Sequence, residues 1–158
     1  MDDHEALRDG LARLLEDRGL HVVGSAGTAA AAEELLESGA PDVAVIDIRL
    51  PDESGIELTK RLLARRPRMG ILLYTGDADA ELLFGGLDSG ARGYALKTGS
   101  MSELVAAIER VAGGGSYVDP RLDRVLLSER STSRLPLAGL TGGAGSQGQT
   151  DRGQRQWG

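Results

Sequence analysis

The sequence contains no cysteine, which excludes disulfide-bonded scaffolds and metal sites built from thiolates. It has no uninterrupted apolar stretch of the roughly 20 residues that a membrane-spanning helix needs. The N-terminus is acidic, whereas a secretory signal peptide starts with basic residues and continues with an apolar run. Together these absences predict a cytoplasmic protein that does not associate with membranes.

Positive charge is in the minority: 18 Lys and Arg stand against 24 Asp and Glu, and the net charge is −6. An acidic protein binds the phosphate backbone of nucleic acids poorly. The length of 158 residues and the hydrophobic content of 41% suit one compact domain with a real core and some additional chain. A second large domain does not fit in this length.

Helical and strand patterns alternate along most of the chain. Continuous apolar or β-branched segments predict strands at 20–27, 41–48, 69–76 and 92–97. Segments with apolar residues at helical spacing precede, separate and follow them, at 4–19, 28–39, 55–67, 77–90 and 100–115. Because parallel neighbours need helical crossovers, this alternation predicts a doubly wound parallel α/β sheet.

The first predicted element is a helix, and the strand that should precede it is missing. Asp2 and Asp3 stand where the carboxyl end of that strand would lie. In doubly wound sheets, ligands bind beyond the carboxyl ends of the strands. The acidic pair is therefore expected at the ligand-binding edge of the sheet.

Polar side chains also stand at the carboxyl ends of three predicted strands: Asp47, Thr75 and Lys97. Carboxylates that converge in one cleft repel one another unless a cation lies among them. Hard oxygen ligands suit Mg²⁺, which proteins commonly bind with one or two carboxylates and a phosphate oxygen. A carboxylate beside Mg²⁺, with a lysine and a hydroxyl nearby, has the groups needed to accept a phosphoryl group.

From Asp2 to about Leu127, the sequence closely resembles the receiver domain of bacterial two-component response regulators. The matching stretches are DD at Asp2 and Asp3, VIDIRLPDESG around Asp47, LLYTG with Thr75, and GARGYALK with Tyr94 and Lys97. The resemblance is strongest to the subfamily typified by NarL and FixJ. It implies a flavodoxin-like, CheY-like fold with strand order 2-1-3-4-5, in which strand 1 is largely missing here.

The resemblance implies a metal and phosphorylation site. In that site Asp3 ligates Mg²⁺ directly, and Asp2 assists through a water molecule. The carbonyl group of Arg49 completes the metal site beside Asp47. Asp47 accepts the phosphoryl group, and Lys97 pairs with the resulting phosphate. Such a domain is mainly a signalling phosphoacceptor, with at most self-phosphorylation and self-dephosphorylation as enzymatic activity.

The resemblance also implies a switch, in which Thr75 moves toward the phosphoryl group and Tyr94 swings inward behind it. Packing explains an aromatic residue at Tyr94 equally well. The helix with Gly85 and Gly86 is expected to be the least stable, because each interior glycine costs about 1 kcal/mol relative to alanine. This weak helix is the expected output surface.

The implied partners are a sensor histidine kinase, which donates the phosphoryl group, and a second copy of the chain, which joins it in a homodimer on phosphorylation. Members of the subfamily usually bind DNA through a C-terminal helix-turn-helix that regulates transcription. No such pattern is visible in this sequence. DNA binding is therefore expected only through a C-terminal domain absent from this chain.

Residues 1–117 are predicted to form the receiver domain, 118–135 a linker with a short helix, and 136–158 a disordered tail. The last 20 residues contain seven Gly and four Gln, so this segment has too little apolar surface to order itself. One hypothesis is that a frameshift or an early stop replaced the DNA-binding domain. The missing body of strand 1 indicates either a true start upstream of Met1 or a damaged, non-functional receiver.

Two other classes of function are compatible with an acidic pocket. A haloacid-dehalogenase-like phosphatase also uses a strand-end Asp with Mg²⁺, but it needs a second acid two residues later, where this sequence has Arg49. A phosphorylation-independent interaction module needs the pocket only to stabilise a partner-binding face. His4 is expected to be a helix-end residue and not a ligand, because Mg²⁺ favours oxygen.

Overall fold

A computed structural model describes residues 1–129, so the tail predicted at 136–158 lies outside the described residues. Met1–Pro120 form one compact unit, and a second unit begins at Arg121. Residues 123–129 of the second unit are helical. Within the described part of the chain, every helix is too short or too polar to cross a bilayer.

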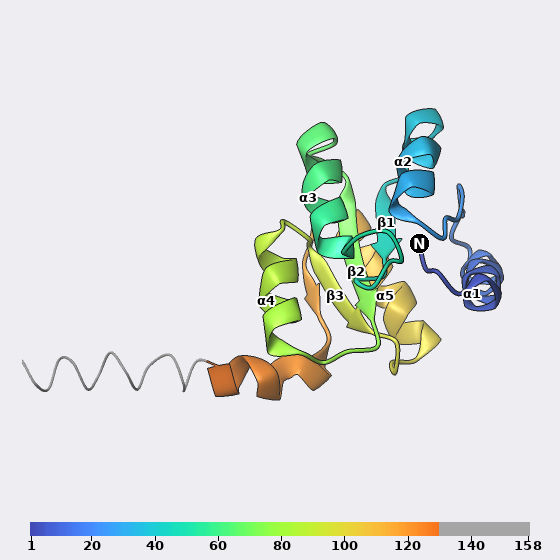
Figure 1. Cartoon of the computed structure of the whole chain (residues 1–158). Helices are drawn as coiled ribbons and strands as arrows, with labels where there is room; N and C mark the ends of the chain where they lie inside the picture. The colour runs from blue at the N-terminus through green and yellow to red at the C-terminus, as the bar shows by residue number, and fades with distance from the viewer. Residues whose placement is uncertain (130–158) are drawn as a thin grey trace, which may run out of the picture. The chain divides into compact units, whose positions relative to one another are not determined.

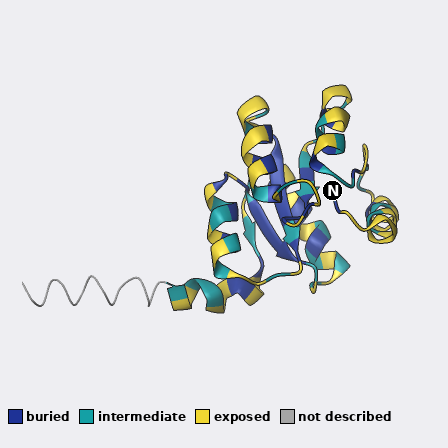
Figure 2. Cartoon of the chain, viewed as in Figure 1, coloured by how far each residue is buried: buried dark blue, intermediate teal, exposed yellow. Residues whose placement is uncertain are grey.

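Four parallel strands form one sheet, with β1, β2, β3 and β4 as successive neighbours (Figure 1). Their bounds are Val43–Ile46 for β1, Gly70–Thr75 for β2, Gly93–Leu96 for β3 and Tyr117–Val118 for β4. Strands β2 and β3 are almost entirely buried (Figure 2), as expected of a parallel sheet that is covered on both faces. The predicted doubly wound α/β fold is confirmed.

Helices at all five predicted positions connect and cover the strands. They are α1 (Glu5–Asp17), α2 (Ala29–Ser38), α3 (Gly55–Arg65), α4 (Ala80–Asp88) and α5 (Met101–Ala112), followed by the 3-10 turn η1 (Pro120–Leu122). The side chains that cap the first turns of α2 to α5 are Thr28, Ser54, Asp79 and Ser100. These caps satisfy amides that have no partner within the helix, and they explain where the four helices begin.

The two faces of the sheet are packed against different helices, because successive residues of a strand point to opposite faces. Leu72 of β2 belongs to an apolar cluster with Leu104 of α5 and Leu15 of α1. The next residue, Leu73, lies against Gly86 of α4 on the other face. The sheet therefore lies between two layers of helices.

The strand predicted at 20–27 is wrong, because these residues are not part of the sheet. Met1 and Asp2 lie between this segment and β1. The amide of Asp2 donates to the carbonyl oxygen of Ala26 at 3.1 Å, and the N-terminal ammonium of Met1 donates to that of Val45 at 2.9 Å. Two residues make too short a ladder to define a strand, but they place the acidic pair at the carboxyl edge of the sheet.

Strand β4 is absent from the sequence-based prediction. The amide of Tyr117 donates to the carbonyl oxygen of Arg92 at 3.0 Å, and the amide of Asp119 donates to that of Tyr94 at 2.9 Å. These bonds extend the sheet beyond β3. A two-residue strand shows no apolar periodicity, so the pattern of the sequence could not reveal it.

Candidate functional site

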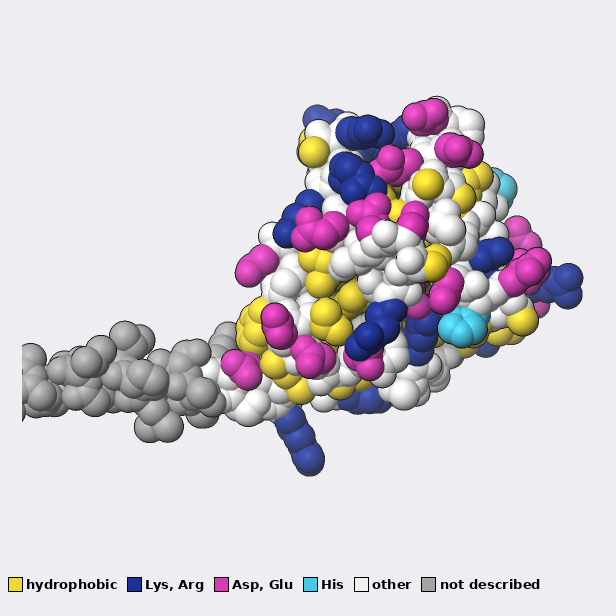
Figure 3. Space-filling model, in the orientation of Figure 1, with side chains coloured by type: hydrophobic (Ala, Val, Ile, Leu, Met, Phe, Trp, Pro, Cys, Tyr) yellow, Lys and Arg dark blue, Asp and Glu magenta, His cyan; other side chains and the backbone are white. Residues whose placement is uncertain are grey.

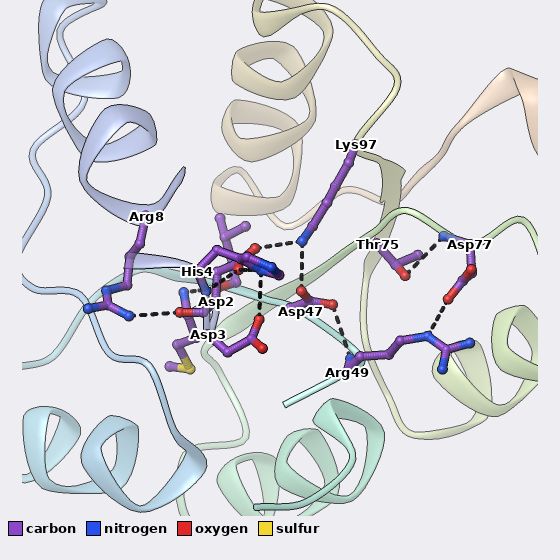
Figure 4. Close-up of polar contacts among 11 residues, drawn as sticks. Asp2, Asp3, His4, Arg8, Asp47, Arg49, Thr75, Asp77 and Lys97 are labelled. Atoms are coloured by element: carbon purple, nitrogen blue, oxygen red, sulfur yellow. Dashed lines mark hydrogen bonds and ion pairs between the residues drawn. The ribbon is translucent and has the colours of Figure 1, made fainter. Parts of the chain in front are cut away.

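Three predicted site residues meet at the carboxyl edge of the sheet. Asp47 directly follows β1, Thr75 is the last residue of β2, and Lys97 directly follows β3. Asp47 and Thr75 expose only 6% and 1% of their surface. Figure 4 shows that Asp2 joins Asp47 and Lys97 from the N-terminal segment.

Lys97 connects the two buried carboxylates of this site. Its Nζ lies 2.6 Å from Oδ2 of Asp2 and 2.7 Å from Oδ2 of Asp47 (Figure 4). Both aspartates are buried, and two buried negative charges repel each other unless a cation lies between them. A single ammonium group therefore joins acids that are far apart in the sequence.

Burial and hydrogen bonding oppose each other in the Asp2–Lys97 pair. Burial favours the neutral carboxyl of Asp2, but hydrogen bonds from Lys97 and from the amide of His4 prevail and hold the pKa of Asp2 below its ordinary value. Burial also favours the neutral amine of Lys97. Its hydrogen bonds to Asp2 and Asp47 prevail here too, and they raise the pKa of Lys97. The pair therefore stays charged at neutral pH.

Backbone contacts hold Asp47 in place. Its amide donates to the carbonyl oxygen of Met1 at 3.0 Å, and its Oδ1 accepts from the amide of Arg49 at 3.0 Å. Gly55, at the start of α3, approaches so closely that a Cβ there would overlap the carbonyl oxygen of Asp47. The glycine that ends the VIDIRLPDESG motif is thus required by the packing of α3 against this residue.

The neighbours Asp2 and Asp3 have different environments. Asp2 is buried and accepts a hydrogen bond from the amide of His4 at 3.0 Å, whereas the side chain of Asp3 is 40% exposed. Nδ1 of His4 lies 3.0 Å from Oδ1 of Asp3, and one ligand atom from each of the three residues lies within 4.8 Å of the others. His4 directly precedes α1, as expected of a helix-end residue, but its side chain makes no capping bond. The side chain contacts the acidic pair instead, which the sequence analysis did not predict.

A second group of contacts surrounds Thr75. Its Oγ1 accepts a hydrogen bond from the amide of Asp77 at 3.3 Å. The carboxylate of Asp77 forms an ion pair with Nε of Arg49 (Figure 4). This ion pair links the segment after β1 to the segment after β2. The sequence analysis did not single out Asp77. The one indication was its position, since it is an acidic residue just beyond the end of β2.

Tyr94 is fully buried in β3. Burial, with a smaller contribution from the nearby acids Asp79 and Asp77, raises the pKa of its phenol to about 12. Its hydroxyl has no hydrogen-bond partner within residues 1–129. The ring lies beside Gly86 of α4, so Tyr94 contributes to the core between β3 and α4.

The sequence of residues 1–109 matches the response regulator receiver domain. The chain belongs to the response regulator receiver family. The predicted family is thereby confirmed.

Several characterised relatives of this receiver are transcription regulators. The receiver is 40% identical over 145 residues to the DNA-binding transcriptional activator DevR/DosR of Mycobacterium tuberculosis, covering 89% of this chain and 67% of that protein. It is 34% identical over 130 residues to the transcriptional regulatory protein DegU of Brevibacillus brevis, covering 82% of this chain and 55% of DegU. The chain thus spans between 55% and 67% of the length of these two relatives.

Solved structures support the same fold. A LuxR-family two-component response regulator from Aurantimonas sp. SI85-9A1 superposes with a TM-score of 0.78 at 34% identity, covering 82% of this chain and 94% of that one. A CheY-like receiver domain from Methanospirillum hungatei gives a TM-score of 0.67 at 31% identity, covering 72% and 90%. The predicted flavodoxin-like, CheY-like architecture is confirmed.

The donor set of this site suits Mg²⁺, which receiver domains generally use at the phosphorylation site. Asp2, Asp3 and Asp47 offer carboxylate oxygens, the hard ligands that Mg²⁺ prefers. Two of these carboxylates converge on Lys97, and Asp3 lies beside them with its side chain partly open to solvent. The chemistry of these residues therefore fits the metal.

Proposed function

We propose that this receiver accepts a phosphoryl group on Asp47 from the phosphohistidine of a sensor histidine kinase, in a reaction that depends on Mg²⁺. The observation that carries the proposal is the ammonium of Lys97 between the buried carboxylates of Asp2 and Asp47. This arrangement supplies a nucleophilic carboxylate and a cation at the edge of the sheet where ligands of doubly wound folds bind.

In the proposed transfer, a carboxylate oxygen of Asp47 attacks the phosphorus atom. The P–N bond of the phosphohistidine breaks as the P–O bond of an acyl phosphate forms. The imidazole nitrogen keeps the bonding electron pair and takes up a proton from solvent. Lys97, which pairs with Asp47 before the transfer, then pairs with a phosphoryl oxygen, and the hydroxyl of Thr75 donates to another.

The acidic residues have a second role beside this chemistry. Asp2, Asp3 and Asp47, with the carbonyl group of Arg49, would hold Mg²⁺, whose charge neutralises the phosphoryl oxygens when it is bound. The hydrogen bond between Oδ1 of Asp47 and the amide of Arg49 supports this assignment, because it folds the chain after β1 tightly around the acceptor.

We further propose that phosphorylation changes the surface formed by α4. Thr75 is the last residue of β2, and its hydroxyl is tied to the segment before α4 through Asp77. A new bond from this hydroxyl to a phosphoryl oxygen would pull on that segment. Tyr94 lies next to Gly86 of α4, so a shift of α4 would be accompanied by a rearrangement around the Tyr94 ring.

The activity of the whole protein is proposed from the relatives. DevR/DosR is a DNA-binding transcriptional activator, and RcsB, at 26% identity, has a structure as dimers bound to DNA. We propose that phosphorylation of this receiver promotes a homodimer and regulates transcription. DNA binding would require a region beyond the receiver.

The direct test is the intact mass of the full chain after incubation with Mg²⁺ and acetyl phosphate. Asp47→Asn removes the acceptor, and Asp42→Asn, just before β1 at the opposite edge of the sheet, is the matched control. One phosphoryl adduct is expected on the parent and on Asp42→Asn, and none on Asp47→Asn or after chelation of Mg²⁺. A folded parent without an adduct, or an adduct that persists in Asp47→Asn, would overturn the proposal. The first of these results would favour the interaction module.

A further inference from the structure

Asp52 lies in the segment between β1 and α3, yet its carboxylate caps α2. Oδ1 accepts a hydrogen bond from the amide of Ala29 at 3.0 Å, and Oδ2 accepts one from the amide of Ala30 at 3.2 Å. The same helix already has a local cap, because Oγ1 of Thr28 accepts from the amide of Ala31 at 3.1 Å. The start of α2 therefore has one cap from its own chain segment and one from the segment between β1 and α3.

The turn before α2 is also tied to the acidic pair. The amide of Asp2 donates to the carbonyl oxygen of Ala26 at 3.1 Å. The guanidinium of Arg8 donates to the carbonyl oxygen of Asp2 at 2.9 Å and lies close to Gly27. The turn from Ala26 to Ala30 thus contacts Asp2 on one side and Asp52 on the other.

The loop that carries Asp52 is closed on itself. Arg49 and Ser54 form an antiparallel bridge across it, and the amide of Arg49 donates to Oδ1 of Asp47. Through these bonds, a displacement of Asp52 would shift the backbone of Arg49, which is the proposed metal ligand on this side of the site.

We propose that Asp52 is a positioning residue. It holds the loop from Arg49 to Ser54 at a fixed position relative to Asp2, and so sets the affinity of the site for Mg²⁺. The inference rests on the proposed function, since it concerns the same metal site. The turn before α2 is the common anchor: one bond fixes Asp2 to it, and two bonds from Asp52 fix the loop. Partners of metal ligands that orient them in this way change metal affinity when they are removed.

Ion pairs that do not involve Asp52 also hold the loop from Arg49 to Ser54. Arg61 of α3 forms ion pairs with Glu53 of the loop and with Glu33 of α2. Figure 3 shows basic side chains over α3 beside acidic side chains over α2. Because this network is independent of Asp52, an Asp52 variant is expected to loosen the loop without unfolding the domain.

The test compares Asp52→Ala with Thr28→Ala in the full chain. Each variant removes one cap from α2, but only Asp52→Ala releases the loop. Mg²⁺ alone is titrated while the amide signal of Arg49 is followed by NMR, and the melting temperature is measured in parallel. A Kd for Mg²⁺ about tenfold weaker is expected in Asp52→Ala. A Kd close to that of the parent is expected in Thr28→Ala, with a comparable drop in melting temperature in both variants.

Equal changes of the Mg²⁺ Kd in the two variants, or a parent-like Kd in Asp52→Ala, would reduce Asp52 to a helix cap and overturn the inference. Hydrogen exchange measured without metal distinguishes a failure of this inference from a failure of the proposed function. Faster exchange at 48–54 is expected in Asp52→Ala and not in Thr28→Ala. If the parent binds no Mg²⁺, the proposed metal site fails, and unchanged exchange at 48–54 then also overturns the positioning role.

Discussion

The ammonium group of Lys97, at the end of β3, reaches across β2 and lies 2.7 Å from the carboxylate of Asp47, at the end of β1. The contact spans two strand spacings of a parallel sheet, about 9.5 Å between strand axes, so it needs a long side chain with a terminal charge. It places positive charge beside Asp47, at the end of β1.

Lys97→Gln is expected to bind Mg²⁺ more tightly than the parent. Removing the ammonium leaves the buried carboxylates of Asp2 and Asp47 without a cation, and a metal ion then meets no competing charge. The expected gain in affinity is about tenfold, measured by the shift of melting temperature with Mg²⁺ concentration. Lys60→Gln, which breaks only an exposed ion pair with Glu57, should behave like the parent. Unchanged or weaker binding in Lys97→Gln would contradict this prediction.

The domain is expected to lose stability in acid partly through Asp2. The folded pKa of Asp2 is lower than its ordinary value of 3.8. The charged carboxylate therefore stabilises the fold above pH 3.8, and this stabilisation is lost as the pH falls through the folded pKa. Urea unfolding at pH 7 and at pH 3 measures the loss. The free energy of unfolding should fall less in Asp2→Asn than in the parent. Asp9→Asn, on the exposed side of α1, should follow the parent, and an equal fall in all three would count against the prediction.

The two glycines of α4 are expected to respond to alanine in opposite ways. A Cβ at Gly85 would lie 3.5 Å from Ile56, an ordinary contact, so Gly85→Ala should stabilise the domain by about 0.5–1 kcal/mol. A Cβ at Gly86 would lie 2.6 Å from Leu73 and 3.2 Å from Tyr94, so Gly86→Ala should destabilise it by about 1–3 kcal/mol. Chemical denaturation checks both values, and effects of the same sign would refute the distinction.

Gly55→Ala is expected to be severely destabilising. The added Cβ would overlap the backbone carbonyl of Asp47, and this backbone, which directly follows β1 and is hydrogen-bonded to Met1, cannot yield as a flexible side chain can. A loss of about 3 kcal/mol in the free energy of unfolding is expected. Gly10→Ala on α1, where a Cβ meets nothing within 4 Å, is the control and should be neutral or stabilising. A parent-like Gly55→Ala would show that α3 can move away from Asp47 at little cost.

Local signals predicted the helices well. The helices predicted at 28–39 and 100–115 begin where Thr28 and Ser100 cap their first turns, and a cap acts only on amides within one turn of itself. The strand predicted at 20–27 was wrong for the opposite reason: its β-branched residues favour an extended chain, but a strand exists only when a neighbour completes its hydrogen bonds. β4 was missed because Tyr117 and Val118 owe their strand conformation to β3.

The sequence by itself determined the alternation of strands and helices, and hence the edge at which Asp47, Thr75 and Lys97 meet. Apolar periodicity and the direction of parallel strands are enough for that inference. Only the tertiary structure decided that Lys97 bonds to both Asp2 and Asp47, that Arg49 pairs with Asp77, and that Asp52 caps α2. The reason is physical. Each of these contacts joins groups from segments far apart in the chain, and their distances depend on how helices and strands pack, which no local pattern encodes.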